Sequence, residues 1–272
     1  MSDSLTTGSL RRLFRFPFEG PGWQTKILVG SAFVLANSIL PLIPGILVGG
    51  YVLRVMRQTI DGKEPALPAW DDWGKMLVDG LRMMVINLVY FLPALLVFTI
   101  GMGLYFAGTL YLPMAAAMGE APGEGMASYG MVLTGSMVAL FLSMSVGTLL
   151  ALLAVIALPA ATAHFAAEDR LAAAFHLRQW WRMISADKLG YFISLVIVAG
   201  LASVLYLAIR LAYYTLVLCC LIPVLAAPLG FFVSLVWSAL FGQTYRESKA
   251  AIQSSEPEDA VPALDLDGPS TG

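Results

Sequence analysis

Long apolar stretches alternate with short polar ones along most of this chain. After Lys26 no charged residue occurs before Arg54, yet a single helix over residues 26–58 would reach about 50 Å, against a hydrocarbon core of about 30 Å. Pro41 and Pro44 lie in the middle of this stretch. Because proline removes a helical donor and disfavours helix in the residue before it, we predict a hairpin whose second helix runs over residues 44–58.

Four further apolar segments follow, each of a length that can cross a bilayer. We expect them at residues 83–112, 131–160, 191–209 and 226–243. A glycine-rich stretch at residues 119–128 separates the first two, and Pro223 and Pro228 mark a turn before the last. The pattern predicts an all-α, polytopic membrane bundle of about six spans. At the two proline turns, re-entrant hairpins stay open as an alternative to full spans.

Residues 171–184 carry a different periodicity, that of an amphipathic helix at the membrane surface. On a 100° wheel one arc is apolar and the opposite arc is polar, although Leu171 and Phe175 fall outside the pattern. The apolar arc contains Ala174, Leu177, Trp180, Trp181 and Ile184, and the polar arc contains His176, Arg178, Gln179 and Arg182. We therefore predict an interfacial helix here.

Composition supports the membrane assignment. The chain is 58% hydrophobic and 12% charged, with a mean hydropathy of +0.78, whereas a soluble domain is about half apolar and about a quarter charged. The expected partner of this surplus apolar surface is the lipid bilayer. We divide the chain into a basic N-terminal segment (1–21), a transmembrane domain (22–250) and an acidic, proline-rich tail (251–272) that we expect to be disordered.

The distribution of positive charge predicts the orientation. With six spans and a cytoplasmic N-terminus, every lysine and arginine except Arg210 falls on the cytoplasmic side. If residues 26–58 formed one span, the cytoplasmic side would keep only Arg11, Arg12, Arg15, Lys26 and Arg210. The positive-inside rule therefore favours a multi-pass protein of the cell membrane, with both termini in the cytoplasm.

The polar interval between the second and third spans holds the candidate interaction site. Tryptophans beside an apolar segment commonly anchor at headgroup depth, where ring and N–H are both satisfied. The alternative is a cytoplasmic surface that docks a protein partner from the membrane or the cytoplasm. The residues of that candidate surface are Arg54, Arg57, Trp70, Asp71, Asp72 and Trp73.

Several of these residues form an ordered motif. The order is Trp23, Lys26, Pro44, Gly50-Tyr51 with Arg54, Leu67-Pro68-x-Trp70-x-x-Trp73-Gly74, Asp79-Gly80, and later Ala173-Ala174-Phe175 and Tyr191. Over roughly residues 16–245 the chain thereby resembles an uncharacterised family of prokaryotic multi-pass membrane proteins, known as a domain of unknown function. The resemblance implies the helical membrane architecture. It brings no substrate, mechanism or catalytic residue.

No residue cluster in the sequence predicts a reaction, a cofactor or a metal site. His164 and Glu168 are spaced to share a helical face, but a metal site would need three or four convergent ligands, and His176 falls about 120° away around a continuous helix. Nucleic-acid binding has no support in the charge pattern. The spans lack ionisable residues away from their ends, which disfavours proton-coupled transport.

Three functions stay open. The first is a non-catalytic membrane component that acts through its cytoplasmic face, and we favour it because polar residues concentrate at 59–75 and 168–188. The second is a permease or lipid-handling protein for a neutral or lipidic substrate. The third is a membrane enzyme.

Overall fold

The computed structural model describes residues 7–40, 42–118, 125–214 and 222–255. All regular structure within these ranges is helical, so the predicted all-α class is confirmed. The α-helices are α1 (Thr7–Arg15), α2 (Trp23–Ala36), α3 (Ile43–Ile60), α4 (Trp73–Ala117), α5 (Gly125–Glu168), α6 (Leu177–Ala186), α7 (Lys188–Tyr214) and α8 (Ile222–Ser255), with short 3₁₀ turns η1 (Phe16–Phe18) and η2 (Leu171–Phe175).

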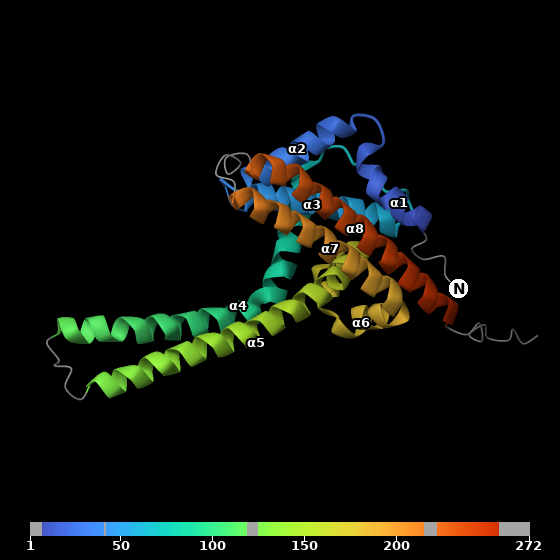
Figure 1. Ribbon diagram of the computed structural model, residues 1–272. Coiled ribbons are helices and arrows are strands. Elements are labelled where there is room, and N and C mark those ends of the chain that lie inside the picture. The colour runs from blue at the N-terminus through green and yellow to red at the C-terminus, as the bar shows by residue number, and fades with distance from the viewer. Residues whose placement is uncertain (1–6, 41, 119–124, 215–221, 256–272) are drawn as a thin grey trace, which may run out of the picture.

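Helices α1, α2, α3, α7 and α8 and the beginning of α4 pack together into what we call the body (Figure 1). Helix α3 lies at its centre, between α2, α8 and the beginning of α4. Its side chains from Tyr51 to Met56 are almost all buried, and α8 contributes Phe231 and Leu235 to the same core. Helix α7 packs on α8, and α1 packs on α8 through Leu13. The body is thus built around the one helix that carries both Arg54 and Arg57.

Helices α4 and α5 form a long antiparallel pair that projects from this body (Figure 1). The beginning of α4 lies against α3, after which the helix changes direction and runs beside α5. Pro93 lies inside α4, and an interior proline, which removes a backbone hydrogen bond and clashes with the preceding turn, is the commonest cause of a sharp helix kink. We call the beginning of α4 and the end of α5 the root of the pair. The root packs in the body, whereas the far end of the pair projects away from it.

Glycines allow α3 and α4 to cross backbone against backbone. A Cβ atom on Gly50 would lie 2.0 Å from the Met76 carbonyl oxygen, and one on Gly80 would lie 1.8 Å from the Ile46 carbonyl oxygen. Neither position has room for any side chain. Gly49 lies beside Gly80 at the same crossing. The close approach of α3 and α4 therefore depends on Gly49 and Gly50 in α3 and on Gly80 in α4.

Four helices are long and apolar enough to cross a membrane: α4, α5, α7 and α8. They correspond to the predicted segments at 83–112, 131–160, 191–209 and 226–243, and their mostly exposed apolar surfaces suggest a membrane protein. Helix α2 has 14 residues, and α3 has 18 residues including two arginines. The two further spans expected in this region stay a prediction.

Some local predictions differ from the structure. The single helix expected at 171–184 is broken at His176 into η2 and α6, which explains why Leu171 and Phe175 did not fit its periodicity. Pro228, expected in a turn, lies inside α8, while Pro223 occupies the helix start where proline is well tolerated. The predicted loop and tail are shorter than expected, because residues 125–128 begin α5 and residues 251–255 end α8. Residues 119–124 and 256–272 lie outside the described residues.

Candidate functional site

The candidate residues meet where α3 contacts the linker 61–72 and the start of α4. Arg54 donates from Nη1 to Asp71 Oδ1 at 2.8 Å, and its Nη2 lies 3.3 Å from Asp72 Oδ2. The guanidinium is mostly buried, whereas 70% of the Asp71 side chain and 56% of the Asp72 side chain are exposed. The hydrogen bond from Arg54 lowers the pKa of Asp71. Asp71 is thus ionised at neutral pH, and Arg54 holds both acids in place with their outer faces accessible.

Arg57, one helical turn further along α3, links the two roots of the projecting pair. Its Nη1 donates to Asp79 of α4, and its Nη2 donates to Asp169 Oδ1 just after α5 at 2.7 Å. Arg82 lies 3.9 Å from Asp79 and 3.7 Å from Asp169. Because only 2% of the Asp79 side chain is exposed, these two arginines supply the opposite charge that a buried carboxylate requires.

Two of these acids adopt strained backbone conformations. Asp72 has φ 47° and Asp169 has φ 52°, in the left-handed region that non-glycine residues seldom occupy. Asp72 precedes the first residue of α4 and accepts the Lys75 N–H at 3.3 Å, as helix N-caps do. Asp169 follows the last residue of α5. Asp72 therefore lies at the start of α4 and Asp169 at the end of α5, and an α3 arginine holds each side chain.

The tryptophans of the candidate site belong to a continuous aromatic stack. Trp70 lies on Tyr51 with ring centroids 4.1 Å apart and an interplanar angle of 15°, and Trp73 lies on Trp70 at 5.8 Å and 26°. Phe33 of α2 contacts both tryptophans. The inner end of the stack is fully buried at Tyr51, while 45% of Trp73 is exposed at the outer end.

Hydrogen bonds to the backbone fix the linker that carries this stack. Trp70 donates from Nε1 to the Lys26 carbonyl at 3.0 Å, and Lys26 donates from Nζ to the Leu67 carbonyl at 2.7 Å. Tyr51 donates to the Pro68 carbonyl at 3.0 Å. We call Trp70, Asp71, Asp72 and Trp73 the platform, because these bonds and the Arg54 contacts hold it rigidly on α2 and α3.

A second polar network is buried near the end of α5. His164, only 3% exposed, pairs its Nδ1 with the Tyr245 hydroxyl at 2.8 Å and its Nε2 with Gln179 Oε1 at 2.9 Å. Glu168 Oε1 lies 3.3 Å from the same Nε2. The network joins α5, α6 and α8 through the two ring nitrogens of His164.

Of the six candidate residues, the structure brings five together, namely Arg54, Trp70, Asp71, Asp72 and Trp73. Arg57 lies one helical turn away on α3 and contacts Asp79 and Asp169 instead. The sequence did not indicate the residues elsewhere in the chain that contact these six. They are Lys26, Phe33, Tyr51, Asp79 and Asp169. Lys26, Tyr51 and Asp79 were part of the sequence motif, and that was the available signal. Within the described residues, no group of three or more His, Cys, Asp or Glu side chains is arranged to hold a metal ion.

Residues 33–214 match the model of a family described as a protein of unknown function (DUF4013). The chain belongs to this family. The match covers α3 to α7 and therefore both arginine clusters and the platform, while Lys26 and Tyr245 fall outside it. No similar curated protein and no similar solved structure was found. The resemblance noted from the sequence is thus confirmed at the level of an uncharacterised family.

Membership of DUF4013 assigns no activity, so the geometry of the site has to indicate what it can do. Its charged groups are paired with one another through Arg54 and Arg57, and its one large exposed side chain is Trp73 at the end of a buried stack. Such an arrangement suits recognition of another surface, because an exposed aromatic ring with accessible acids beside it is already held in place.

Proposed function

We propose that this DUF4013 protein is a non-catalytic component of the cell membrane that docks a polypeptide partner on its cytoplasmic face. The observation that carries the proposal is the fixed platform. Trp73 presents nearly half of its ring to the surroundings, while its neighbour Trp70 is hydrogen-bonded and stacked in the body. Binding to such a surface costs little ordering entropy, and exposed tryptophans of this kind are the residues on which interface energy concentrates.

The exposed chemistry of the platform indicates the kind of partner. Arg54 is mostly buried beneath the platform, whereas Asp71 and Asp72 present their carboxylates outward, so the accessible charge is negative. A complementary surface would offer an apolar recess for the Trp73 ring, flanked by a lysine or an arginine. We propose a protein segment of this composition as the partner.

The membrane arrangement that we propose has six spans with both termini in the cytoplasm. Support comes from Figure 1, where the helix ends that face the α2–α3, α4–α5 and α7–α8 connections all lie on the left, while α1, α6 and the end of α8 lie on the right. Helix α3 would be about 27 Å long, close to the thickness of the hydrocarbon core.

Helix α6 fits an interfacial position in this arrangement. Trp180 packs into the body at 6% exposure, whereas Leu177 and Trp181, four residues apart, are 64% and 61% exposed. Leu189 and Phe192 at the start of α7 are also exposed, so the apolar surface continues from α6 onto a candidate span. An amphipathic helix with tryptophan on its apolar side is suited to the headgroup region.

The docking proposal is tested by truncating the exposed ring. The tagged full-length protein is crosslinked in cells, purified in mild detergent and quantified for copurifying polypeptides, with Trp73→Ala and Asp71→Lys as the variants. Loss of a tryptophan hot spot costs about 2 kcal/mol, or about 30-fold in affinity. Asp71 is chosen over Asp72 because Asp72 also caps α4.

Trp181→Ala is the matched control, because this ring is at least as exposed but lies on α6. We expect normal partner recovery with Trp181→Ala and with Trp73→Phe, and reduced recovery with Trp73→Ala and Asp71→Lys. If Trp73→Ala and Trp181→Ala affect recovery equally, or if no polypeptide is retained in stoichiometric amounts, the docking proposal is wrong.

The orientation is tested separately by cysteine labelling in intact cells. Single cysteines at Glu64 and Ser254 are expected to be shielded from an impermeant reagent, and a cysteine at Glu124 is expected to react. Labelling at position 64 from outside would refute the six-span arrangement and leave the platform facing the exterior.

A further inference from the structure

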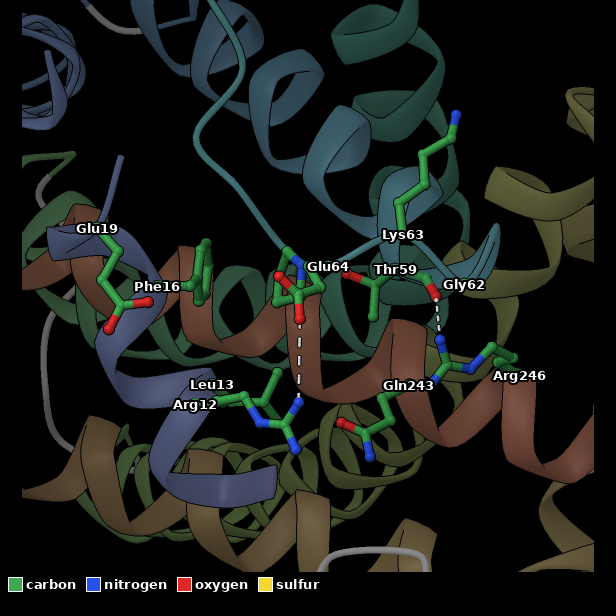
Figure 2. Close-up of a pocket in the computed structure, with 11 residues that line it drawn as sticks. Arg12, Leu13, Phe16, Glu19, Thr59, Gly62, Lys63, Glu64, Gln243 and Arg246 are labelled. Carbon is green, nitrogen blue, oxygen red and sulfur yellow. Dashed lines mark hydrogen bonds and ion pairs between the residues drawn. The ribbon is translucent and has the colours of Figure 1, made fainter. Parts of the chain in front are cut away.

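A recess separate from the platform lies between α1, the start of the 61–72 linker and α8 (Figure 2). Its volume is about 270 Å³, enough for a phosphate group with the glycerol attached to it. Leu13 and Phe16, both less than 5% exposed, form an apolar wall of the recess. We infer that this recess binds the phosphate group of an anionic membrane lipid.

Positive charge exceeds available negative charge in the recess. Three cations line it, Arg12, Lys63 and Arg246, together with two acids, Glu19 and Glu64. Glu19 is already paired with Arg15 at 3.3 Å, and Lys63 with Asp61 at 3.6 Å, both through partners outside the lining. Arg12 and Arg246 therefore face Glu64 as the one remaining acid of the lining. Glu64 lies 4.0 Å from Arg12, with 90% and 76% of the two side chains exposed, and such a pair contributes little.

Arg246 supplies the best-placed donor. It donates from Nη1 to the Thr59 carbonyl at a long 3.4 Å, and within the described part of the chain it forms no ion pair with a carboxylate. A guanidinium carries five N–H donors and binds phosphate oxygens in pairs. In Figure 2, Arg12 and Arg246 lie on either side of Gln243, so both can approach one anion from α1 and from α8.

A lipid is the favoured source of the phosphate. Basic pockets beside membrane helices on the cytoplasmic side attract anionic headgroups, because the inner leaflet is negatively charged. The recess borders α8, one of the four candidate spans, and its apolar wall suits the carbon atoms next to a headgroup. The choice of a lipid rests on the proposed orientation, whereas the anion chemistry rests only on the residues that line the recess.

The test is lipid retention by the purified full-length protein, measured by native mass spectrometry during titration with phosphatidylglycerol or phosphatidylcholine. We expect preferential retention of phosphatidylglycerol and about tenfold weaker retention in Arg246→Gln, since a hydrogen bond to a charged group is lost. Glu64→Gln should strengthen retention several-fold, because it removes a competing carboxylate. Glu64 is almost fully exposed, so this variant keeps the fold.

Arg178→Gln is the control, because it removes an equal charge from an exposed position on α6. Equal retention of both lipids, or equal losses in Arg178→Gln and Arg246→Gln, would refute the inference. Inorganic phosphate distinguishes the source. If it raises the melting temperature of the wild type but not of Arg246→Gln while phosphatidylglycerol is not retained, the ligand is a free phosphate compound and the lipid assignment is wrong. Neither result depends on whether Trp73 docks a partner.

Discussion

Replacing Arg57 by alanine would test whether this arginine holds the roots of α4 and α5 together. The change leaves the Asp79 carboxylate buried without its main partner and also frees Asp169. Arg82 remains, but 40% of its side chain is exposed and its nearest nitrogen is 3.9 Å from Asp79. It can therefore offset only part of the loss.

The expected magnitude follows from burial. Opposite charges about 4 Å apart attract by about 4 kcal/mol at an effective dielectric constant of 20, and removal of one partner from a buried pair costs about 3–5 kcal/mol. With Arg82 in place, we expect Arg57→Ala to lower the free energy of unfolding by about 3 kcal/mol. Asp169→Asn should cost less than about 1 kcal/mol, because this acid is 58% exposed.

The assay is equilibrium unfolding by sodium dodecyl sulfate in mixed micelles, followed by tryptophan fluorescence. Arg57→Met combined with Asp79→Leu is the informative control. Removing both charges together should recover most of the stability lost in Arg57→Ala, since no unpaired buried charge remains. A cost below about 1 kcal/mol for Arg57→Ala, or a double variant no more stable than Arg57→Ala, would refute this account of the cluster.

Three further predictions concern the α3–α4 region. Gly50→Ala should destabilise the protein by more than about 2 kcal/mol, because the new Cβ meets backbone, whereas Gly103→Ala, in open space, should leave the melting temperature unchanged or slightly raised. Trp70→Phe should cost about 1 kcal/mol in unfolding free energy through its lost hydrogen bond. Because the Arg54 hydrogen bond lowers the pKa of Asp71, its stabilisation is complete above the unfolded pKa of about 4 and disappears as the pH falls through the folded value. In Asp71→Asn, stability should therefore fall less steeply below about pH 4.

The sequence predicted the features of this fold that depend on local composition. Apolar length located the long helices, because residue type alone decides whether a segment prefers lipid. Pro44 marked the start of α3 correctly, whereas Pro228 lies inside α8. Residues 44–58, for example, correspond closely to α3. The prediction of one continuous helix over residues 171–184 failed at His176 for a physical reason. A helical wheel assumes continuous backbone geometry, and it cannot detect a break where an isolated residue adopts a non-helical conformation, here φ −79° and ψ 74°.

The pairing of charges could not be predicted in the same way. Arg54 was placed on one surface with Asp71 and Asp72, but the partners of Arg57, Asp79 and Asp169, lie 22 and 112 residues away in the chain. Which acid meets which arginine depends on the crossing of α3 and α4, and that crossing depends on Gly50 and Gly80. Periodicity in one helix contains no information about such a crossing.

This crossing also explains why one short helix carries so much of the candidate site. Because α3 meets α4 without intervening side chains, its two arginines can reach the N-terminal end of α4 and the residue that ends α5 at the same time. Without these arginines, Asp72 and Asp169 would be unpaired at helix ends with strained backbone. The platform and the root of the projecting pair therefore share one support. A change at the α3–α4 crossing should disturb both, whereas a change at the outer face of Trp73 should disturb recognition alone.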